Sequence, residues 1–170
     1  MANNCCYSMK IVGTKGNCER FVRKLESYEE PNHFWRIFEA GVYNCDGDDD
    51  NYEMYIYGDC AWSLETCCRA SGYSDGIDLF KVNTKELNLV LEAWSEESGI
   101  GFQEHYIYDN GECLADEYLD IGVYWWNRDE YPTYAEFKED YPDAPEEEKF
   151  DDNDEVVVGG FGDEYKKWHI

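Results

Sequence analysis

Basic residues are scarce in this chain of 170 residues. Lys and Arg number 14 against 39 Asp and Glu, a formal net charge of −25 at pH 7, and none lies between Lys85 and Arg128. This anionic excess excludes nucleic acid and anionic membranes as direct ligands, because like charges repel. It also exceeds the magnitude of roughly 2–8 that solubility requires of a small domain. We therefore expect a basic protein partner, with generic surface acidity as the alternative.

Long hydrophobic runs are also absent, so the sequence offers no membrane-spanning segment. The opening residues MANNCCYSMK lack the charged and apolar regions of a signal peptide. We therefore expect a cytoplasmic protein whose eight cysteines are reduced. The cysteines form no CxxC pair, and the neighbours Cys5 and Cys6 would point to opposite faces of a strand. Buried structural thiols are therefore favoured over a metal site.

Motifs that carry catalysis or bind cofactors are missing as well. The three histidines lie in no nucleophile motif, and strand alternation favours a sheet face for His105. No Walker or G-x-G-x-x-G phosphate-binding pattern is present. The acidic residues 44–51 begin like a calcium-binding loop, but Asn51 and Tyr57 stand where Gly and Glu are required. The sequence therefore predicts no metal, no cofactor and no enzymatic activity.

Aromatic residues are abundant, at 17% of the chain within a hydrophobic content of 43%, so we expect a folded domain. Asn110-Gly111 predicts a type I′ hairpin turn, and Thr133 with Glu136 predicts a helical capping box. Helices and strands are mixed without strict alternation, which indicates the α+β class. We expect strands at residues 4–12, 34–43, 52–59, 86–94, 101–108, 112–118, 121–126 and 156–161, helices at 17–30, 60–70 and 133–141, and a turn-rich loop at 71–78.

The order of the first elements resembles a ferredoxin-like βαββαβ unit. The segments NCCYSMKIVG and CERFVRKL, and later EAWSEESGIGF followed by DNGE, resemble YubB-type ferredoxin-like domains of phage and plasmid proteins. The likeness covers residues from about 4 to 118. It implies a ferredoxin-like core with an added β-hairpin, which we place in a domain of residues 1–128. The acidic C-terminal third departs from the family, and from the residues alone we expect a helix and strand extension at 129–170 packed on that domain. The likeness also implies a mobile-element protein without an established enzymatic site.

The most acidic stretch runs from Asp129 to Glu155, with thirteen acidic residues against Lys138 and Lys149. Small, very acidic phage proteins include DNA mimics, among them anti-CRISPR and anti-restriction proteins, and this chain resembles them in kind. A mimic needs rows of carboxylates, because duplex DNA carries one charge per roughly 1.7 Å. The likeness implies an inhibitor that binds a basic nucleic-acid-binding groove, most naturally in a CRISPR effector. The alternatives are a protein-binding module that engages a basic host protein without mimicry, and a small enzyme.

Two groups of residues are expected to bind the partner, one in the acidic turn after residue 45 and one in the acidic stretch. Aromatic side chains among the carboxylates would supply desolvated anchors, with packing of the C-terminal segment as the alternative. The expected residues are Asp46, Asp48, Asp49, Asp50, Glu136, Glu139, Asp140, Asp143, Glu146, Glu147, Glu148, Asp151, Asp152, Tyr134 and Tyr141.

Overall fold

A computed structural model of the chain describes residues 4–69, 76–165 and 167–170. They form a seven-stranded sheet in which all neighbouring strands are antiparallel, in the order β2-β3-β1-β4-β5-β6-β7. No helix within these residues is long and apolar enough to span a bilayer. The strands are β1 (Asn4–Gly13), β2 (Gly41–Gly47), β3 (Tyr52–Ala61), β4 (Val90–Glu97), β5 (Phe102–Asp109), β6 (Glu112–Trp125) and β7 (Glu155–Gly159).

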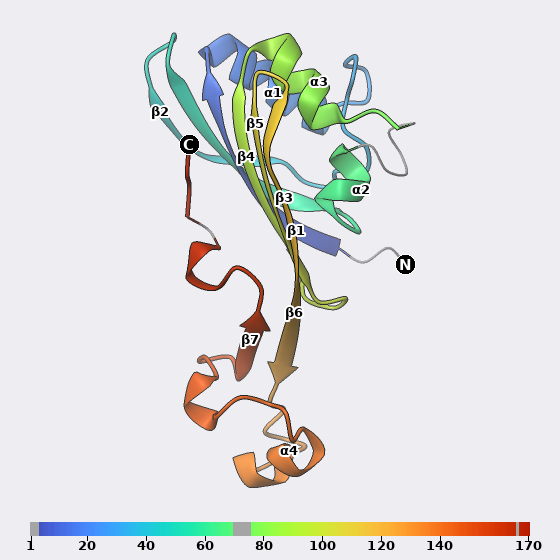
Figure 1. The fold of residues 1–170 in the computed structure, drawn as a ribbon, viewed down its shortest axis with the longest axis vertical. Helices are drawn as coiled ribbons and strands as arrows, with labels where there is room; N and C mark the ends of the chain where they lie inside the picture. Colours follow the sequence, from blue (N-terminus) through green and yellow to red (C-terminus); the bar gives the residue numbers. More distant parts are fainter. Residues whose placement is uncertain (1–3, 70–75, 166) are drawn as a thin grey trace.

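The helices α1, α2 and α3 cover one face of the sheet, and α4 lies far from them at the end of the molecule (Figure 1). On β1, Tyr7, Met9 and Ile11 point toward these helices and are buried, because alternate residues of a strand share one face. Phe21 and Leu25, one turn apart on α1, pack onto the same cluster. The helices are α1 (Lys15–Glu26), α2 (Leu64–Cys68), α3 (Leu79–Leu87) and α4 (Tyr134–Asp140), with short 3₁₀ turns at Glu147–Lys149 and Gly162–Glu164.

The chain after β7 returns across the opposite face of the sheet (Figure 1). The amide of Phe161 donates to Oε1 of Gln103 on β5 (2.9 Å). Further along, the ring of Trp168 contacts that of Tyr55 on β3, with centroids 6.0 Å apart. This segment, called the C-terminal strap (residues 160–165 and 167–170), therefore covers the face that the helices leave open.

Several sequence predictions are confirmed. The class is α+β, although the sheet is larger than the four strands of the expected core. Asn110 and Gly111 have φ of 46° and 85° and join β5 to β6, as a type I′ turn requires. Thr133 and Glu136 form the expected capping box at the start of α4.

The strand predicted at residues 34–43 is wrong. The chain is irregular there, since Phe38 and Glu39 both donate their amides to the carbonyl oxygen of Asp59 (2.8 and 3.3 Å). Arg36 also has a positive φ of 54°. Of the aromatic residues that suggested a strand, Phe34 is buried in the main core, whereas Trp35 and Phe38 are exposed. Strand β2 begins only at the end of the predicted segment.

Helix α1 begins at Lys15, earlier than the residue 17 that the sequence predicts, and Thr14 is its N-cap residue. The side-chain amide of Asn17 instead donates to the carbonyl oxygen of Leu87 (2.7 Å) and ties α1 to the end of α3. A side chain that suits a cap is thus used for a contact between helices.

Helix α3 is absent from the sequence prediction, which assigns a strand to residues 86–94. The buried face of α3 includes the polar residues Asn83 and Thr84, which interrupt its apolar periodicity. Asp78 caps this helix by accepting the amide of Lys81 (2.9 Å). The predicted strand is correct only from the start of β4 onward.

The helix predicted at residues 60–70 is present but shorter, as α2. Ser63 is its N-cap, and Leu64, Cys67 and Cys68 are buried. The predicted loop at 71–78 lies mostly outside the described residues.

We predict that Gly111→Ala destabilises the fold by about 1–3 kcal/mol, because alanine is strained at positive φ. An added Cβ would also lie 2.7 Å from Cβ of Lys85. Urea unfolding measures the change as a shift in the midpoint at constant slope. The control is Gly16→Ala on α1, where a Cβ meets nothing within 4 Å, and which we expect to be neutral or stabilising. Equal destabilisation by both variants would contradict the prediction.

Candidate functional site

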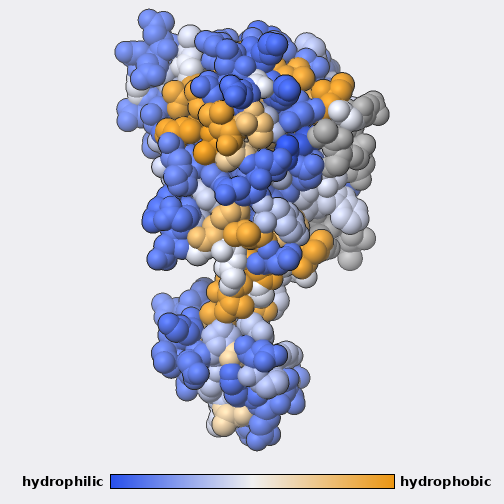
Figure 2. Space-filling view, in the orientation of Figure 1, coloured by the Kyte–Doolittle hydropathy of each residue, from blue (hydrophilic) through white to orange (hydrophobic). Residues whose placement is uncertain are grey.

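Residues 126–155 form a small body of their own, called the acidic lobe, at the far end of β6 and β7 (Figure 1). A narrow waist separates it from the rest of the molecule (Figure 2). Its core is distinct from the main core and is built almost wholly from aromatic side chains. This second cluster contains Trp126, Phe137 and Ala144, with Tyr124, Tyr131, Tyr134 and Phe150 packed against it.

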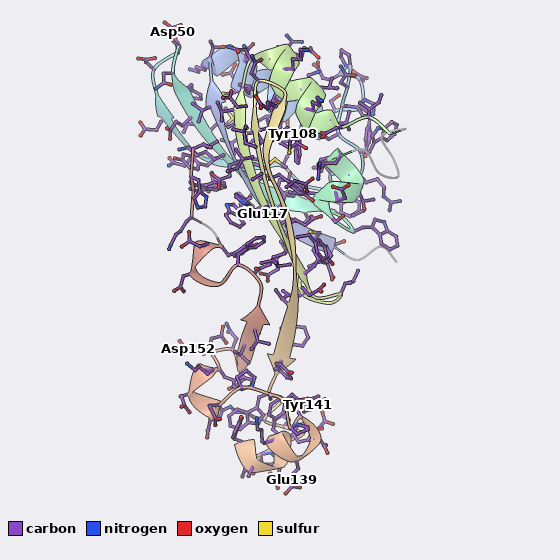
Figure 3. All side chains as sticks on the ribbon, viewed as in Figure 1. Asp50, Tyr108, Glu117, Glu139, Tyr141 and Asp152 are labelled. Carbon is purple, nitrogen blue, oxygen red and sulfur yellow. The ribbon has the colours of Figure 1, made fainter. Side chains whose placement is uncertain are left out.

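The acidic residues predicted to bind a partner are all exposed. They surround the aromatic centre of the lobe and cover its outside, and the exposed set is Glu136, Glu139, Asp140, Asp143, Glu146, Glu147, Glu148, Asp151 and Asp152. Figure 3 shows Glu139, Tyr141 and Asp152 at this end of the molecule. The predicted extension at 129–170 therefore divides into two parts: residues 129–155 lie in the lobe, and the strap lies on the sheet.

Three of these carboxylates also hold the lobe together. Oε2 of Glu136 accepts the amide and hydroxyl of Thr133 (3.0 and 2.9 Å). Oδ2 of Asp140 accepts the hydroxyl of Tyr131 (2.9 Å). Asp151 accepts the amides of residues 153 and 155, and these bonds lower its pKa below the usual value. These three residues are therefore poor choices for a binding test, because their loss would disturb the fold.

The two predicted aromatic anchors differ in placement. Tyr134 packs in the lobe core and donates its hydroxyl to the carbonyl oxygen of Pro145. Tyr141 is 44% exposed, and one face of its ring stacks on Phe137 with centroids 4.8 Å apart. Of the two, Tyr141 is the one that the lobe presents outward.

The lobe's own basic side chains are largely engaged within it. Arg128 donates to both carboxylate oxygens of Asp154 (2.6–2.8 Å), and its guanidinium lies 3.9 Å from the centre of the Trp126 ring. Lys138 donates to the carbonyl oxygen of Ala144. The surface of the lobe is consequently strongly anionic.

A cleft of about 770 Å³ opens beside these groups. Its lining combines the aromatic side chains of Trp126 and Tyr134 with the carboxylates of Glu139 and Glu147. Arg128 and Lys138 also line it, and Arg128 lies over the Trp126 ring while it pairs with Asp154 outside the lining.

The second predicted group is exposed at the end of β2, which contains Asp46, and in the turn to β3, which contains Asp48, Asp49 and Asp50. Oδ1 of Asp48 accepts the amides of Asp50 and Asn51 (3.0 and 2.9 Å) and shapes this turn. Figure 3 shows Asp50 at one end of the long axis and Glu139 at the other. The structure therefore does not bring the two predicted groups together into one patch.

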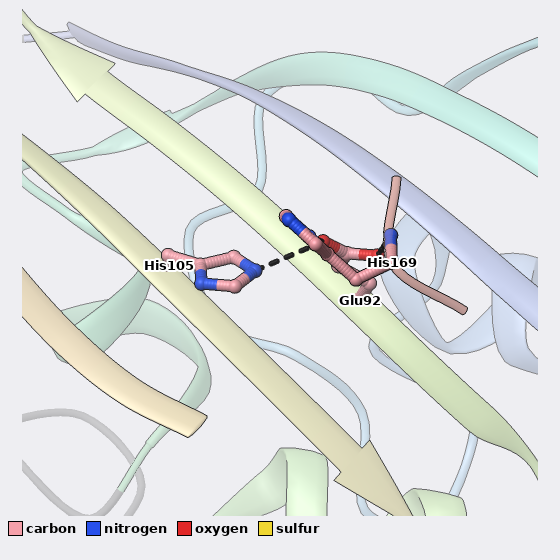
Figure 4. A group of neighbouring side chains, drawn as sticks. All are labelled: Glu92, His105 and His169. Carbon is pink, nitrogen blue, oxygen red and sulfur yellow. Dashed lines mark hydrogen bonds and ion pairs between the residues drawn. The ribbon is translucent and has the colours of Figure 1, made fainter. Parts of the chain in front are cut away.

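A histidine–carboxylate cluster that the sequence analysis missed lies under the C-terminal strap (Figure 4). Oε1 of Glu92 lies 2.9 Å from Nε2 of His105 and 2.7 Å from Nδ1 of His169. Burial alone would raise the pKa of Glu92, but hydrogen bonds with both histidines lower it to about 2. Strand alternation places Glu92 and His105 on one face, but nothing in the sequence indicates that residue 169 returns to them.

The chain has no match among family models, curated proteins or solved structures.

We predict that Phe137→Ala unfolds the acidic lobe and leaves the sheet folded. Phe137 is buried among five aromatic neighbours. Such a truncation costs about 3–5 kcal/mol, which is comparable to the total stability expected of so small a body. Amide hydrogen exchange would show lost protection in residues 126–155 and retained protection in β1 and β4. The matched control is Phe21→Ala in the main core, which should lower protection throughout the sheet. A uniform loss in Phe137→Ala would contradict an independent lobe.

Proposed function

We propose that this chain is a non-enzymatic anti-defence inhibitor that binds a basic nucleic-acid-binding groove, with a CRISPR effector as the first target to test. Under this proposal it is a phage-encoded protein that acts in the bacterial cytoplasm. The observation that carries the proposal is the acidic lobe, a folded body whose nine expected carboxylates are all exposed.

A folded lobe supports this function better than a disordered acidic segment would. The aromatic core fixes the carboxylates before any partner binds, so little conformational entropy is lost on association. The net charge of −25 attracts a basic groove over distance and raises the association rate.

The cleft of the lobe supports a basic partner at the level of side chains. Arg128 and Lys138 line this cleft beside Glu139 and Glu147. The two carboxylates and the ring of Tyr134 suit an arginine or lysine side chain of a partner, which gains from both ion pairing and cation–π contact. Arg128 already makes this pair of contacts with Trp126 and Asp154. Tyr141, outside the cleft, would add an apolar anchor.

The turn at Asp46–Asp50 has a secondary place in this proposal. It lies at the opposite end of the long axis from the lobe (Figure 3). One partner can contact both groups only if its basic surface runs along the molecule, as a nucleic-acid channel does.

We also propose that β1 to β4 with their helices are a ferredoxin-like βαββαβ core, here enlarged by β5, β6 and β7. The order β2-β3-β1-β4 supports this proposal, as do the helical connections from β1 to β2 and from β3 to β4. A shared fold of this kind supports no function by itself.

We predict that Glu146→Gln, Glu147→Gln and Glu148→Gln, combined in one variant, slow association with the effector roughly tenfold or more at low ionic strength. These residues are exposed and lie outside the helical cap of α4, so circular dichroism and thermal midpoint should stay unchanged. Surface plasmon resonance at several salt concentrations measures the rate.

The control is Glu19→Gln, Glu26→Gln and Glu29→Gln, which removes the same charge from exposed positions on or next to α1. Equal effects of the two triple variants would assign the interaction to net charge rather than to the lobe. Displacement of the bound protein by DNA or guide RNA would support mimicry, whereas simultaneous binding would favour the non-mimic binding module.

A further inference from the structure

The histidine–carboxylate cluster has the geometry of a metal site. One atom each from Glu92, His105 and His169 converge, and all three atoms lie within 4.8 Å of one another. The three residues belong to β4, β5 and the C-terminal strap, respectively (Figure 4). We propose that these three residues bind a divalent first-row transition-metal ion such as Zn²⁺.

The outward-facing atom of each ligand is already held. Nδ1 of His105 lies 2.7 Å from a carboxylate oxygen of Glu117, and Nε2 of His169 lies 3.5 Å from one of Glu164. Histidine ligands of metals commonly bind a carboxylate through their other nitrogen, which fixes the tautomer and the ring orientation. His105 has that arrangement, and His169 has a longer contact of the same kind with Glu164.

Hydrogen bonds also orient the carboxylate of Glu92 through the oxygen that faces away from the histidines. Its Oε2 accepts the amides of His169 (2.6 Å) and Ile170 (3.3 Å), which leaves Oε1 directed at the two histidines. Glu92 is completely buried. The three side chains are thus oriented by contacts that do not use their inner atoms.

The count of hydrogen-bond donors favours a cation at the centre. All four ring nitrogens face carboxylate oxygens, whereas a neutral imidazole has a single N–H. Without an ion, a neutral ring would point a lone pair at an oxygen. With an ion, each inner nitrogen coordinates through its lone pair and each outer N–H donates to Glu117 or Glu164. A divalent cation thereby supplies the charge that two extra protons would otherwise provide.

The donor set selects the type of ion. Two imidazoles with one carboxylate suit Zn²⁺ and similar ions, whereas Mg²⁺ and Ca²⁺ prefer oxygen ligands throughout. Bonds of about 2.0–2.2 Å in a tetrahedral site place ligand atoms about 3.3 Å apart. The separations of 2.7 and 2.9 Å between Oε1 of Glu92 and the two nitrogens would therefore widen by roughly half an ångström. The two nitrogens, which lie within 4.8 Å of each other, would have to stand at a similar distance around the ion.

A fourth coordination position would open into an adjacent cavity of about 580 Å³. Trp94, Ile107, Leu119 and Phe161 line it together with the two histidines. The ion would reach the site from the side of His169, whose side chain is 40% exposed. Three protein ligands and one open position is the arrangement that admits water or a small molecule to a bound metal.

Titration of the full-length protein with ZnCl₂ by calorimetry tests the proposal, in a large excess of Mg²⁺ to occupy the exposed carboxylates. We expect one tight Zn²⁺ ion per chain and a raised thermal midpoint. His169→Gln should abolish the tight site, and Glu117→Gln should weaken it roughly 10- to 100-fold by releasing a histidine from its orienting carboxylate. His33→Gln, which removes the histidine outside the cluster, should bind as the wild type does.

Cobalt substitution separates this site from the eight cysteines, because thiolates in general also bind transition metals. Co²⁺ at the cluster should give a visible d–d spectrum without a thiolate-to-cobalt charge-transfer band. Thiolate charge transfer in the tight complex, or equal Zn²⁺ affinity of the wild type and His169→Gln, would overturn the proposal. Glu117 and His169 both reach solvent, so we expect their variants to fold, and the thermal midpoint without metal checks this.

Discussion

The arrangement of the whole molecule depends on a change of partner along strand β6. Up to Asp120, β6 pairs with β5, and from Ile121 it pairs with β7. The amide of Ile121 donates to Gly101 (2.9 Å), whereas the carbonyl oxygen of Asp120 accepts the amide of Gly160 (3.2 Å). These two groups belong to one peptide unit and point to opposite edges of the strand. The switch carries one end of β6 out to the acidic lobe and brings the chain after β7 back to the sheet.

The sequence predicted correctly the parts of the fold that depend on interactions between neighbouring residues. The Asn110-Gly111 turn and the Thr133 cap each depend on a few neighbouring residues, and both are present. Predictions failed where distant partners decide, as at Asn17, whose amide finds Leu87 rather than its own helix end. Helix α3 was not predicted because its buried face contains the polar residue Asn83. The side-chain amide of Asn83 donates to the carbonyl oxygen of residue 32 (2.8 Å). Tertiary hydrogen bonds thus overrode the local pattern.

The candidate sites follow the same division. The acidic stretch is visible as composition, so its exposed carboxylates could be foreseen, but its independent aromatic core could not. The histidine–carboxylate cluster joins residues 92, 105 and 169, and the last of these arrives only through the path of the strap. Residues so far apart in the sequence produce no periodic pattern from which their proximity could be predicted. The acidic lobe and the histidine–carboxylate cluster also differ in kind. The carboxylates of the lobe are exposed to solvent, whereas Glu92 and His105 of the cluster are buried.

The free edge of β6 has a consequence for how copies of this protein meet. Before Ile121, the edge that faces away from β5 pairs with no strand among the described residues. This strand contains four acidic residues and no Lys or Arg, so two copies that paired here would bring like charges together. Added salt screens that repulsion within a few ångströms. Self-association by strand addition should therefore be suppressed in dilute buffer and favoured as ionic strength rises, the reverse of the salt response expected for a basic partner.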